Sequence, residues 1–342
     1  MFEIFHGKRL TKEDRIPGKI PFLTAGEKNQ GVACYIGNKW EKHKNPISID
    51  MFGNSFFHKG IFSGDDNIYF FVTDKITDNS KLFIVNSINA KTKNKYSYGK
   101  QFRQNNADTL TIQLPITSTG KIDFAFMENF ISELEEERIS ELSAYLEVTG
   151  LKDYTLTPEE ENALKDFEKM EWGEFEIGDL FDFLTSKKRF DANKVKILEN
   201  GNFPYIVRTS LNNGTKGYLN ENEEYLNSGN TISFGQDTAT IFYQKEPYFT
   251  GDKIKIVKAK DDLFNAKNAL YFLTSMNKSF QVYSWGSSSF NVDILSKEKM
   301  FLPLQNNSPN YTFMETFIKA VKKLVIKDVV LYAEKKSTQQ KT

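Results

Sequence analysis

The sequence contains one pattern twice, and this duplication constrains the fold more than any other feature. Several blocks return in the same order at an offset of 183 to 188 residues. They pair Gly18–Leu23 with Gly201–Ile206, Ile49–Gly53 loosely with Ile232–Gly235, Phe62–Asp65 with Phe249–Asp252, Tyr96–Gly99 with Tyr283–Gly286, Leu114–Pro115 with Leu302–Pro303, and Asp123–Ile131 with Asn310–Ile318. A repeat of this length predicts two domains of one fold.

Each copy has a β-rich region followed by a helix. Short runs of β-branched and aromatic residues, broken by Gly and Asn, predict strands. These runs are Asn67–Thr73, Lys81–Ile88 and Leu110–Leu114 in the first copy, and Thr231–Phe234, Ile254–Val257 and Met300–Leu304 in the second. After each region, apolar residues recur at three- and four-residue spacing, which predicts an amphipathic helix.

We therefore expect an α+β protein with two tandem β-rich domains, separated by and followed by long helices that pack antiparallel in a pseudo-twofold duplication. The expected segments are a first domain over 1–122, a first spacer helix over 123–150, a linker with a short helix over 151–174, a second domain over 175–309, a second spacer helix over 310–336 and a tail over 337–342. Thr157, Pro158 and Glu160 form a capping box that predicts the start of the linker helix.

The two spacer helices have complementary faces. Glu133, Glu135 and Glu136 lie opposite the apolar stripe of the first helix, whereas Lys319, Lys322 and Lys323 lie opposite that of the second. Antiparallel packing would bury both stripes and place opposite charges along the rim. The residues expected to pair the helices or to dock a partner are Met127, Phe130, Ile131, Leu134, Met314, Phe317, Ile318 and Val321.

Charge is segregated along the chain although 45 Lys and Arg balance 45 Asp and Glu. Residues 1–122 hold 18 basic and 11 acidic groups, a net of +7, and residues 123–150 hold one basic and eight acidic, a net of −7. The basic block suggests contact with a polyanion, or simply a solvated face. A single cysteine excludes a disulfide framework, and without an apolar run of about 18 residues or a signal pattern we expect a cytoplasmic protein with no membrane partner.

Signatures of catalysis are missing from the sequence. It has no glycine-rich phosphate loop, no Gly-x-Gly-x-x-Gly and no His-Glu-x-x-His. No proline precedes an aspartate, so the Pro-Asp…Glu-x-Lys nuclease pattern is absent, as is the Asn/Asp-Pro-Pro-aromatic motif of amino-methyltransferases. Cys34 is flanked by Ala33 and Tyr35, which favours a buried thiol over a nucleophile.

Amides and cations gather in loops at matching positions of the two copies. Arg and Lys read guanine, and Asn and Gln read adenine, in the major groove of DNA, although Asn beside Gly also simply makes turns. The candidates for DNA contact are Lys8, Arg9, Lys28, Asn29, Gln30, Lys100, Gln101, Arg103, Lys187, Lys188, Arg208, Asn212, Asn213, Ser288 and Asn291. Of these, the clusters at Lys8 and Lys187 suit phosphate contacts or a solvated surface equally.

These features together resemble a known family. Gly-x-Ile-Pro-Phe, the opener Trp172-x-x-Phe175-x-Ile177-x-x-Leu180-Phe181, the Tyr-x-Tyr-Gly and Leu-Pro blocks and the Phe-Met-Glu-x-Phe-Ile helix starts are similar to the specificity (S) subunits of restriction–modification systems. The chain is closer in length to the BcgI-like type IIB form than to typical type I members. It departs from the pattern in lacking the Trp-led opener before Phe2, the counterpart of Phe181.

The resemblance implies a non-catalytic subunit with two target-recognition domains, each reading one half of a split site in double-stranded DNA. The helices would set the spacing and dock methyltransferase subunits or fused nuclease–methyltransferase subunits. This chain would bind no cofactor, and S-adenosylmethionine and Mg²⁺ would belong to the partners. The alternatives are a duplicated β-rich module for carbohydrate or another ligand with no DNA role, and a self-sufficient methyltransferase or nuclease.

Overall fold

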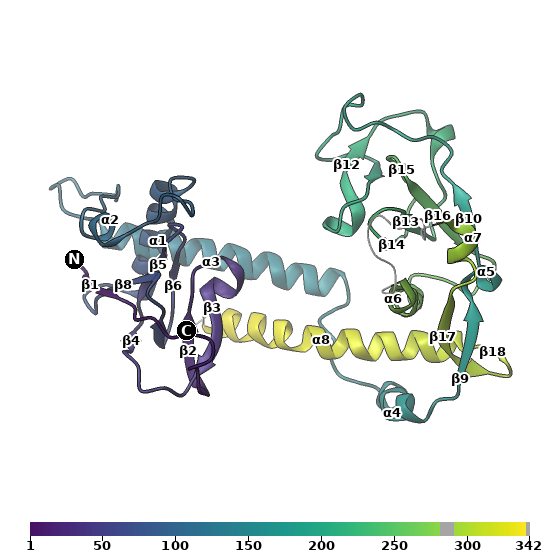
Figure 1. Ribbon diagram of the computed structural model, residues 1–342, viewed down its shortest axis with the longest axis horizontal. Coiled ribbons are helices and arrows are strands. Elements are labelled where there is room, and N and C mark those ends of the chain that lie inside the picture. The colour runs from purple at the N-terminus through teal and green to yellow at the C-terminus, as the bar shows by residue number, and fades with distance from the viewer. Residues whose placement is uncertain (281–290, 340–342) are drawn as a thin grey trace. The chain divides into compact units, whose positions relative to one another are not determined.

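A computed structural model describes residues 1–280 and 291–339, which form two compact units (Figure 1). Unit 1 comprises Met1–Tyr145 together with the C-terminal segment that begins at Ala333, and unit 2 comprises Leu146–Tyr332. Both units combine helices with sheets whose strand pairs are antiparallel except for β2 with β7 and β11 with β15, so the expected α+β class with two tandem β-rich domains is confirmed. The expected Tyr283–Gly286 block lies outside the described residues.

Unit 1 is built on two four-stranded sheets. The first has the order β1-β8-β5-β6, from β1 (Glu3–His6), β8 (Ile68–Val72), β5 (Ile47–Asp50) and β6 (Ser55–Phe57). The second has the order β3-β2-β7-β4, from β3 (Val32–Ile36), β2 (Pro17–Leu23), β7 (Ile61–Gly64) and β4 (His43–Lys44). The helices are α1 (Asp78–Thr92), α2 (Gln104–Asp108) and α3 (Phe124–Val148).

Unit 2 repeats both sheets and adds a third. The repeated sheets are β10-β16-β13-β14, from β10 (Phe181–Thr185), β16 (Ile254–Ala259), β13 (Thr231–Gly235) and β14 (Thr240–Gln244), and β12-β11-β15, from β12 (Thr215–Leu219), β11 (Phe203–Ile206) and β15 (Phe249–Thr250). The third is β18-β17-β9, from β18 (Ser308–Pro309), β17 (Lys299–Gln305) and β9 (Trp172–Glu176). Its helices are α4 (Pro158–Asp166), α5 (Ile177–Leu180), α6 (Ala269–Phe280), α7 (Val292–Leu295) and the part of α8 (Tyr311–Gln339) that precedes Ala333.

The duplication extends to strand register. Ile47 lies opposite Phe71 in unit 1, and Ile232 lies opposite Val257 in unit 2. Ile232 is therefore the structural counterpart of Ile47. The sequence blocks had instead aligned Ile232 with Ile49, which lies two residues later. Because β1 pairs Ile4 with Phe71 and β10 pairs Phe183 with Val257, Phe2 corresponds to Phe181 as expected.

The expected strand at Lys81–Ile88 is wrong, because this segment lies in helix α1. Thr77 caps the helix by accepting a hydrogen bond from the Ser80 N–H. Ile84, Val85 and Ile88 are buried at one, three and four residues apart, the pattern of a helix that covers a sheet. The β-branched residues had favoured a strand, but their burial on one helical face outweighs that weak intrinsic preference.

The expected strand at Leu110–Leu114 is also wrong, because no strand pairs with this segment among the described residues. Its counterpart in unit 2 is β17, which pairs with β9. Among the described residues of unit 1, no segment lies beside it as β9 lies beside β17, so the extended segment forms no ladder.

The two spacer helices begin inside their own domains. Met127 belongs to the core of unit 1, and Met314 and Ile318 belong to the core of unit 2, so these three side chains do not pair the helices with each other. Helix α8 continues to Gln339, which corrects the expected tail for residues 337–339. Near that end, Lys336 Nζ lies 3.2 Å from Glu135 Oε2 within unit 1.

The linker contains the short helix α4, which begins at Pro158. Thr157 accepts from the Glu160 N–H, and the Glu160 carboxylate accepts from the Thr157 N–H, as a capping box requires. None of the helices in the described ranges is long and apolar enough to span a membrane.

Candidate nucleic-acid interface

The two predicted recognition loops share one backbone conformation. Asn29, Gln30 and Gly31 have φ values of 48°, 52° and 82°, and Asn212, Asn213 and Gly214 have 46°, 53° and 79°. Each loop is closed by a hydrogen bond of 2.9 Å, from the Thr24 N–H to the Gly31 carbonyl and from the Val207 N–H to the Gly214 carbonyl. Three successive left-handed residues are uncommon, so their occurrence at matching positions shows that the two loops have one backbone conformation. The fold thus presents the same loop twice with different side chains.

The loop asparagines hold the turn. Asn29 donates weakly to the Val32 carbonyl and Asn212 to the Thr215 carbonyl, both at 3.4 Å. Asn213 donates to the Tyr243 carbonyl at 3.0 Å, and its own carbonyl accepts from Gln244 Nε2 at 3.2 Å. The asparagines therefore form the turns, which is the alternative to base contact that the sequence left open. Lys28 and Gln30 are exposed at the loop tip.

Arg208 meets a carboxylate that the sequence did not associate with it. Asp237, in the turn after β13, accepts from both Arg208 Nη1 and Lys253 Nζ, the latter at 2.7 Å. The Lys253 ammonium foremost, together with Arg208, lowers the pKa of Asp237 against the opposing effect of burial. Two cations around one carboxylate leave one net positive charge beside the recognition loop.

A cavity of about 640 Å³, lined by both charged and apolar side chains, opens next to this cluster in unit 2. Arg189, Arg208 and Lys216 contribute three positive charges to its lining, and Asp191 and Asp252 contribute two negative charges. The net positive lining suits a phosphate group better than it suits an apolar ligand. Asp237, Lys253 and Lys216 come from separate segments, so no sequence signal could have grouped them.

The remaining candidates are distributed over both units. Lys8 Nζ lies 2.6 Å from Glu41, and Arg9 is exposed with Asp66 at 3.9 Å. Lys188 lies over the rings of Phe190 and Tyr225, with its Nζ 4.8 and 4.2 Å from their centroids. A cation held over rings is positioned but still charged.

Several other candidates have local structural roles. Gln101 donates to the Tyr98 carbonyl at 3.2 Å, and the Arg103 N–H donates to Asn106 Oδ1 at the start of α2. Asn291 caps α7 by accepting from the Asp293 N–H. Lys100 and Lys187 are exposed, and Ser288 lies outside the described residues.

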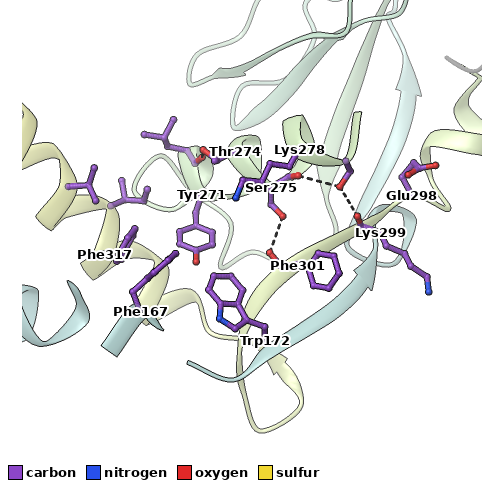
Figure 2. A pocket seen from close by; sticks show the side chains of 14 residues that line it. Phe167, Trp172, Tyr271, Thr274, Ser275, Lys278, Glu298, Lys299, Phe301 and Phe317 are labelled. Atoms are coloured by element: carbon purple, nitrogen blue, oxygen red, sulfur yellow. Dashed lines mark hydrogen bonds between the residues drawn. The ribbon is translucent and has the colours of Figure 1, made fainter. Parts of the chain in front are cut away.

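Unit 2 also contains an apolar cavity of about 960 Å³ between α6, β17 and the first turns of α8. Figure 2 shows Phe167, Trp172, Tyr271 and Phe317 grouped on one side of it, with Phe301 from β17 close to Trp172. The rings of Phe167 and Phe317 stack with centroids 4.6 Å apart. Three residues expected to dock a partner, Phe317, Ile318 and Val321, line this cavity, whereas Phe130 and Leu134 are exposed in unit 1.

Comparison with known proteins gives a consistent answer. Residues 1–144 and 169–331 match the family described as the type I restriction modification DNA specificity domain. Over 154 residues the chain is 33% identical to the type II restriction enzyme specificity subunit S.BcgI of Heyndrickxia coagulans, an alignment that covers 44% of each protein. The fold is similar to that of a type I restriction–modification S subunit from M. genitalium, with a TM-score of 0.58 and 17% identity over 99% of this chain and 90% of that one.

Proposed function

Because this chain belongs to the family of type I restriction–modification DNA specificity domains, we propose that it is the DNA-specificity subunit of a restriction–modification complex. Each unit reads one half of a bipartite site in double-stranded DNA. The observation that carries this proposal is the pair of left-handed loops at Lys28–Gly31 and Asn212–Gly214, which share a backbone and differ in side chains.

Twin loops of this kind suit two different half-sites. A common scaffold sets the depth and angle at which side chains approach a base pair, and the side chains then decide which bases are accepted. Lys28 and Gln30 project a cation and an amide in unit 1, whereas unit 2 has Leu211, Asn212 and Asn213 with Arg208 nearby. The basic cavity beside Arg208 would take a backbone phosphate and hold the loop in register.

The proposal assigns no chemical step to this chain. Methyl transfer and cleavage belong to partner subunits, which would hold S-adenosylmethionine and Mg²⁺. Helix α3 has 25 residues, or about 37 Å at 1.5 Å per residue, which is close to one turn of DNA at roughly 34–36 Å. We propose that the helices set a spacing of about one turn between half-sites.

DNA selection and sequencing test the bipartite reading. A pool of random duplexes, enriched on the chain with its partner subunits, should yield two short constant stretches around a fixed gap. Replacing residues 27–30 by their unit 2 counterparts should alter only one stretch. A change in both stretches, or a single continuous site, would contradict the assignment of one half-site to each unit.

Band shifts separate the DNA role from the carbohydrate alternative. DNA affinity should fall steeply with salt because phosphate contacts release counterions. Glycan binding without DNA affinity would support the alternative. Turnover of DNA by the pure chain with S-adenosylmethionine and Mg²⁺ would show that it is an enzyme by itself.

Inserting one helical turn into both spacer helices tests whether the helices set the spacing between half-sites. The insertion should lengthen the gap between the two half-sites, and an unchanged gap would refute the spacing role.

A further inference from the structure

Asp50, at the end of β5, has a buried carboxylate that ties one recognition loop to the sheet. Its side chain is only 3% exposed. Oδ2 accepts a hydrogen bond of 2.9 Å from the N–H of Gly26, which precedes the loop turn at Lys28–Gly31. Oδ1 accepts from the N–H groups of Phe52 and Asn54, both at 2.9 Å, and Asn54 Nδ2 donates to Oδ2 at 3.0 Å. One oxygen therefore forms the turn after β5, and the other also reaches the loop.

The bond from Gly26 is the one of these four that joins distant parts of the chain. The other three lie within residues 50–54, so they would form the same turn without a loop beside it. A hydrogen bond to a carboxylate is about twice as strong as one between neutral groups. The loop that presents Lys28 and Gln30 is thus held against β5 by a strong contact.

The turn at residues 50–54 also supports the second amide-rich segment of unit 1. The Phe102 N–H donates to the Met51 carbonyl at 2.8 Å, and the ring centroids of Phe52 and Tyr98 lie 6.2 Å apart. Phe102 is fully buried, whereas Tyr98 is 80% exposed. The candidates for DNA contact at residues 100–103 therefore belong to a segment that rests on the same turn as the recognition loop.

Unit 2 links its loop to the sheet in the opposite direction. Strand register places Gly235 where unit 1 has Asp50. Gly235 has no side chain that could reach a loop, and a Cβ atom there would lie 3.2 Å from Cγ of Arg208. Arg208 extends from the loop to Asp237 instead. The carboxylate at position 50 is thus a device of unit 1 alone, and unit 2 provides an internal reference without it.

We propose that Asp50 is a positioning residue for DNA recognition by unit 1, an inference that rests on the proposed function. Because Asp50 is buried, it touches no base. It holds the loop at Lys28–Gly31 and the segment at residues 98–103 on one turn, so that both meet the same half-site as a single surface. Since the placement of side chains decides which bases are accepted, loss of the Gly26 bond relaxes the specificity of one half-site and not of the other.

Asp50→Asn removes the link to the loop selectively. The amide oxygen can still accept from the N–H groups of Phe52 and Asn54, as asparagine does in turns. The NH₂ group that replaces Oδ2 cannot accept from Gly26, whereas the Asn54 amide can turn its oxygen toward it. Asn54→Ala is the matched control, because it removes a hydrogen bond to the same Oδ2 atom and leaves the Gly26 bond in place.

Discrimination between DNA duplexes is the first readout, measured by band shifts with the partner subunits present. A single mismatched base pair should weaken binding of the unaltered chain by about 5- to 150-fold at either half-site. Asp50→Asn should reduce this discrimination about three- to tenfold at the half-site that responds to the exchange of residues 27–30, and leave the other unchanged. The salt slope should stay the same, because no phosphate contact is lost. Asn54→Ala should behave as the unaltered chain.

Hydrogen exchange of the full chain gives a second readout that needs no DNA. Backbone amides of residues 24–31 should lose protection in Asp50→Asn but keep it in Asn54→Ala, while β8 at residues 68–72 stays protected in both. If Asp50→Asn also exposes β8, the double variant Asp50→Asn/Asn54→Asp replaces it. This variant restores the net charge and the side-chain pair of the turn, and position 50 still offers no acceptor to Gly26.

The outcomes separate this inference from the function on which it rests. If the unaltered chain selected no bipartite site, the proposed function would be refuted, and the role of Asp50 with it. If the unaltered chain selected such a site but Asp50→Asn kept its full discrimination, or kept residues 24–31 protected, the positioning role alone would be overturned. Equal losses at both half-sites, or the same loss in Asn54→Ala, would likewise overturn it.

Discussion

Lys323 Nζ lies 3.0 Å from Glu160 Oε2 in unit 2, and both side chains are almost fully buried, at 9% and 2% exposure. The pair joins the linker helix α4 to the middle of α8, and Lys323 also donates to the Thr155 carbonyl at 2.7 Å. Burial opposes ionisation of Glu160, but the Thr157 N–H, Lys323 and Lys319 outweigh it and lower its pKa to about 2. The linker is thus attached to the spacer helix by charge.

Lys323→Met should destabilise unit 2 by about 1–3 kcal/mol, because it removes the buried one of the two cations that lie 3.0 Å from the Glu160 carboxylate and leaves only the exposed Lys319. Lys165→Ala is the matched control, since Lys165 forms an exposed pair with Glu161 on the same helix and should change stability by less than about 1 kcal/mol. Urea unfolding of the full chain, followed by circular dichroism, measures both. Equal effects of the two substitutions would contradict a structural role for the buried pair.

The same carboxylate predicts an acid response. The pKa of Glu160 is lowered from 4.5 to about 2 in the folded chain. The contribution of this carboxylate to stability is therefore complete above pH 4.5 and is lost as the pH falls toward 2. Glu160→Gln should lower stability at neutral pH and flatten the loss across this window. Thermal unfolding between pH 6 and 2.5 tests this, and an unchanged acid slope in the variant would contradict the pKa assignment.

His58 predicts a second acid response, in unit 1 and at higher pH. The ring is 2% exposed and shares a 2.8 Å hydrogen bond with Ser48, and burial lowers its pKa to about 4. The unfolded chain protonates this histidine near pH 6.5 and the folded chain does not, so stability should fall by about 3 kcal/mol between pH 6.5 and 4.

The duplication supplies the variant that tests this response. Gln244 occupies the position of His58 in unit 2 and donates to Ser233 at 3.0 Å. His58→Gln should preserve the buried hydrogen bond while removing the loss of stability between pH 6.5 and 4. If the variant showed the same loss in thermal unfolding, another group would be responsible.

The Arg208–Asp237–Lys253 cluster predicts opposite effects of two substitutions on DNA affinity. Arg208→Ala should weaken binding about three- to tenfold and lower the salt slope by about one, because one phosphate contact is lost. Asp237→Asn should strengthen binding, because it frees both cations from their carboxylate. Lys245→Ala, at an exposed pair with Glu246, is the control. Band shifts at several salt concentrations distinguish these outcomes, and weaker binding of Asp237→Asn would contradict the proposed phosphate site.

Exchanging Gln30 and Asn213 between the recognition loops should change both the stability of the chain and its preference at one half-site. Gln30 adopts φ = 52°, a conformation that costs most L-residues about 1–2 kcal/mol but suits Asn better. Gln30→Asn, which copies Asn213, should raise the unfolding temperature slightly and change the preference at one half-site only. The reciprocal Asn213→Gln should lower the unfolding temperature, since it also removes the anchor to Tyr243. A loss of stability in Gln30→Asn would show that the Gln30 side chain supports the loop.

Local patterns predicted the parts of the fold that depend on local chemistry. The capping box at Thr157 and the apolar stripes that start at Met127 and Met314 each lie within a few residues, so their helices could be placed from sequence. Helix α1 was missed because its β-branched residues resemble a strand when read alone. The cap at Thr77 was the available signal.

The candidate site was only partly predictable. Lys28, Gln30 and Arg208 could be selected because they lie in loops at matching positions of the repeat. Asp237 and Lys253 could not, because they meet Arg208 only after β13 and β16 pair. The deep burial of Met127 likewise depends on a core cluster that also contains Ile84 and Ile88 of α1, which no stripe on one helix reveals.

The sequence by itself determined that this protein consists of two similar β-rich domains with closing helices, because a duplicated pattern in one chain must fold twice under the same local preferences. Only the tertiary structure decided which extended segments become strands and which charged residues converge. A strand exists only where another backbone lies beside it, and residues 299–303 have that neighbour whereas residues 111–115 do not.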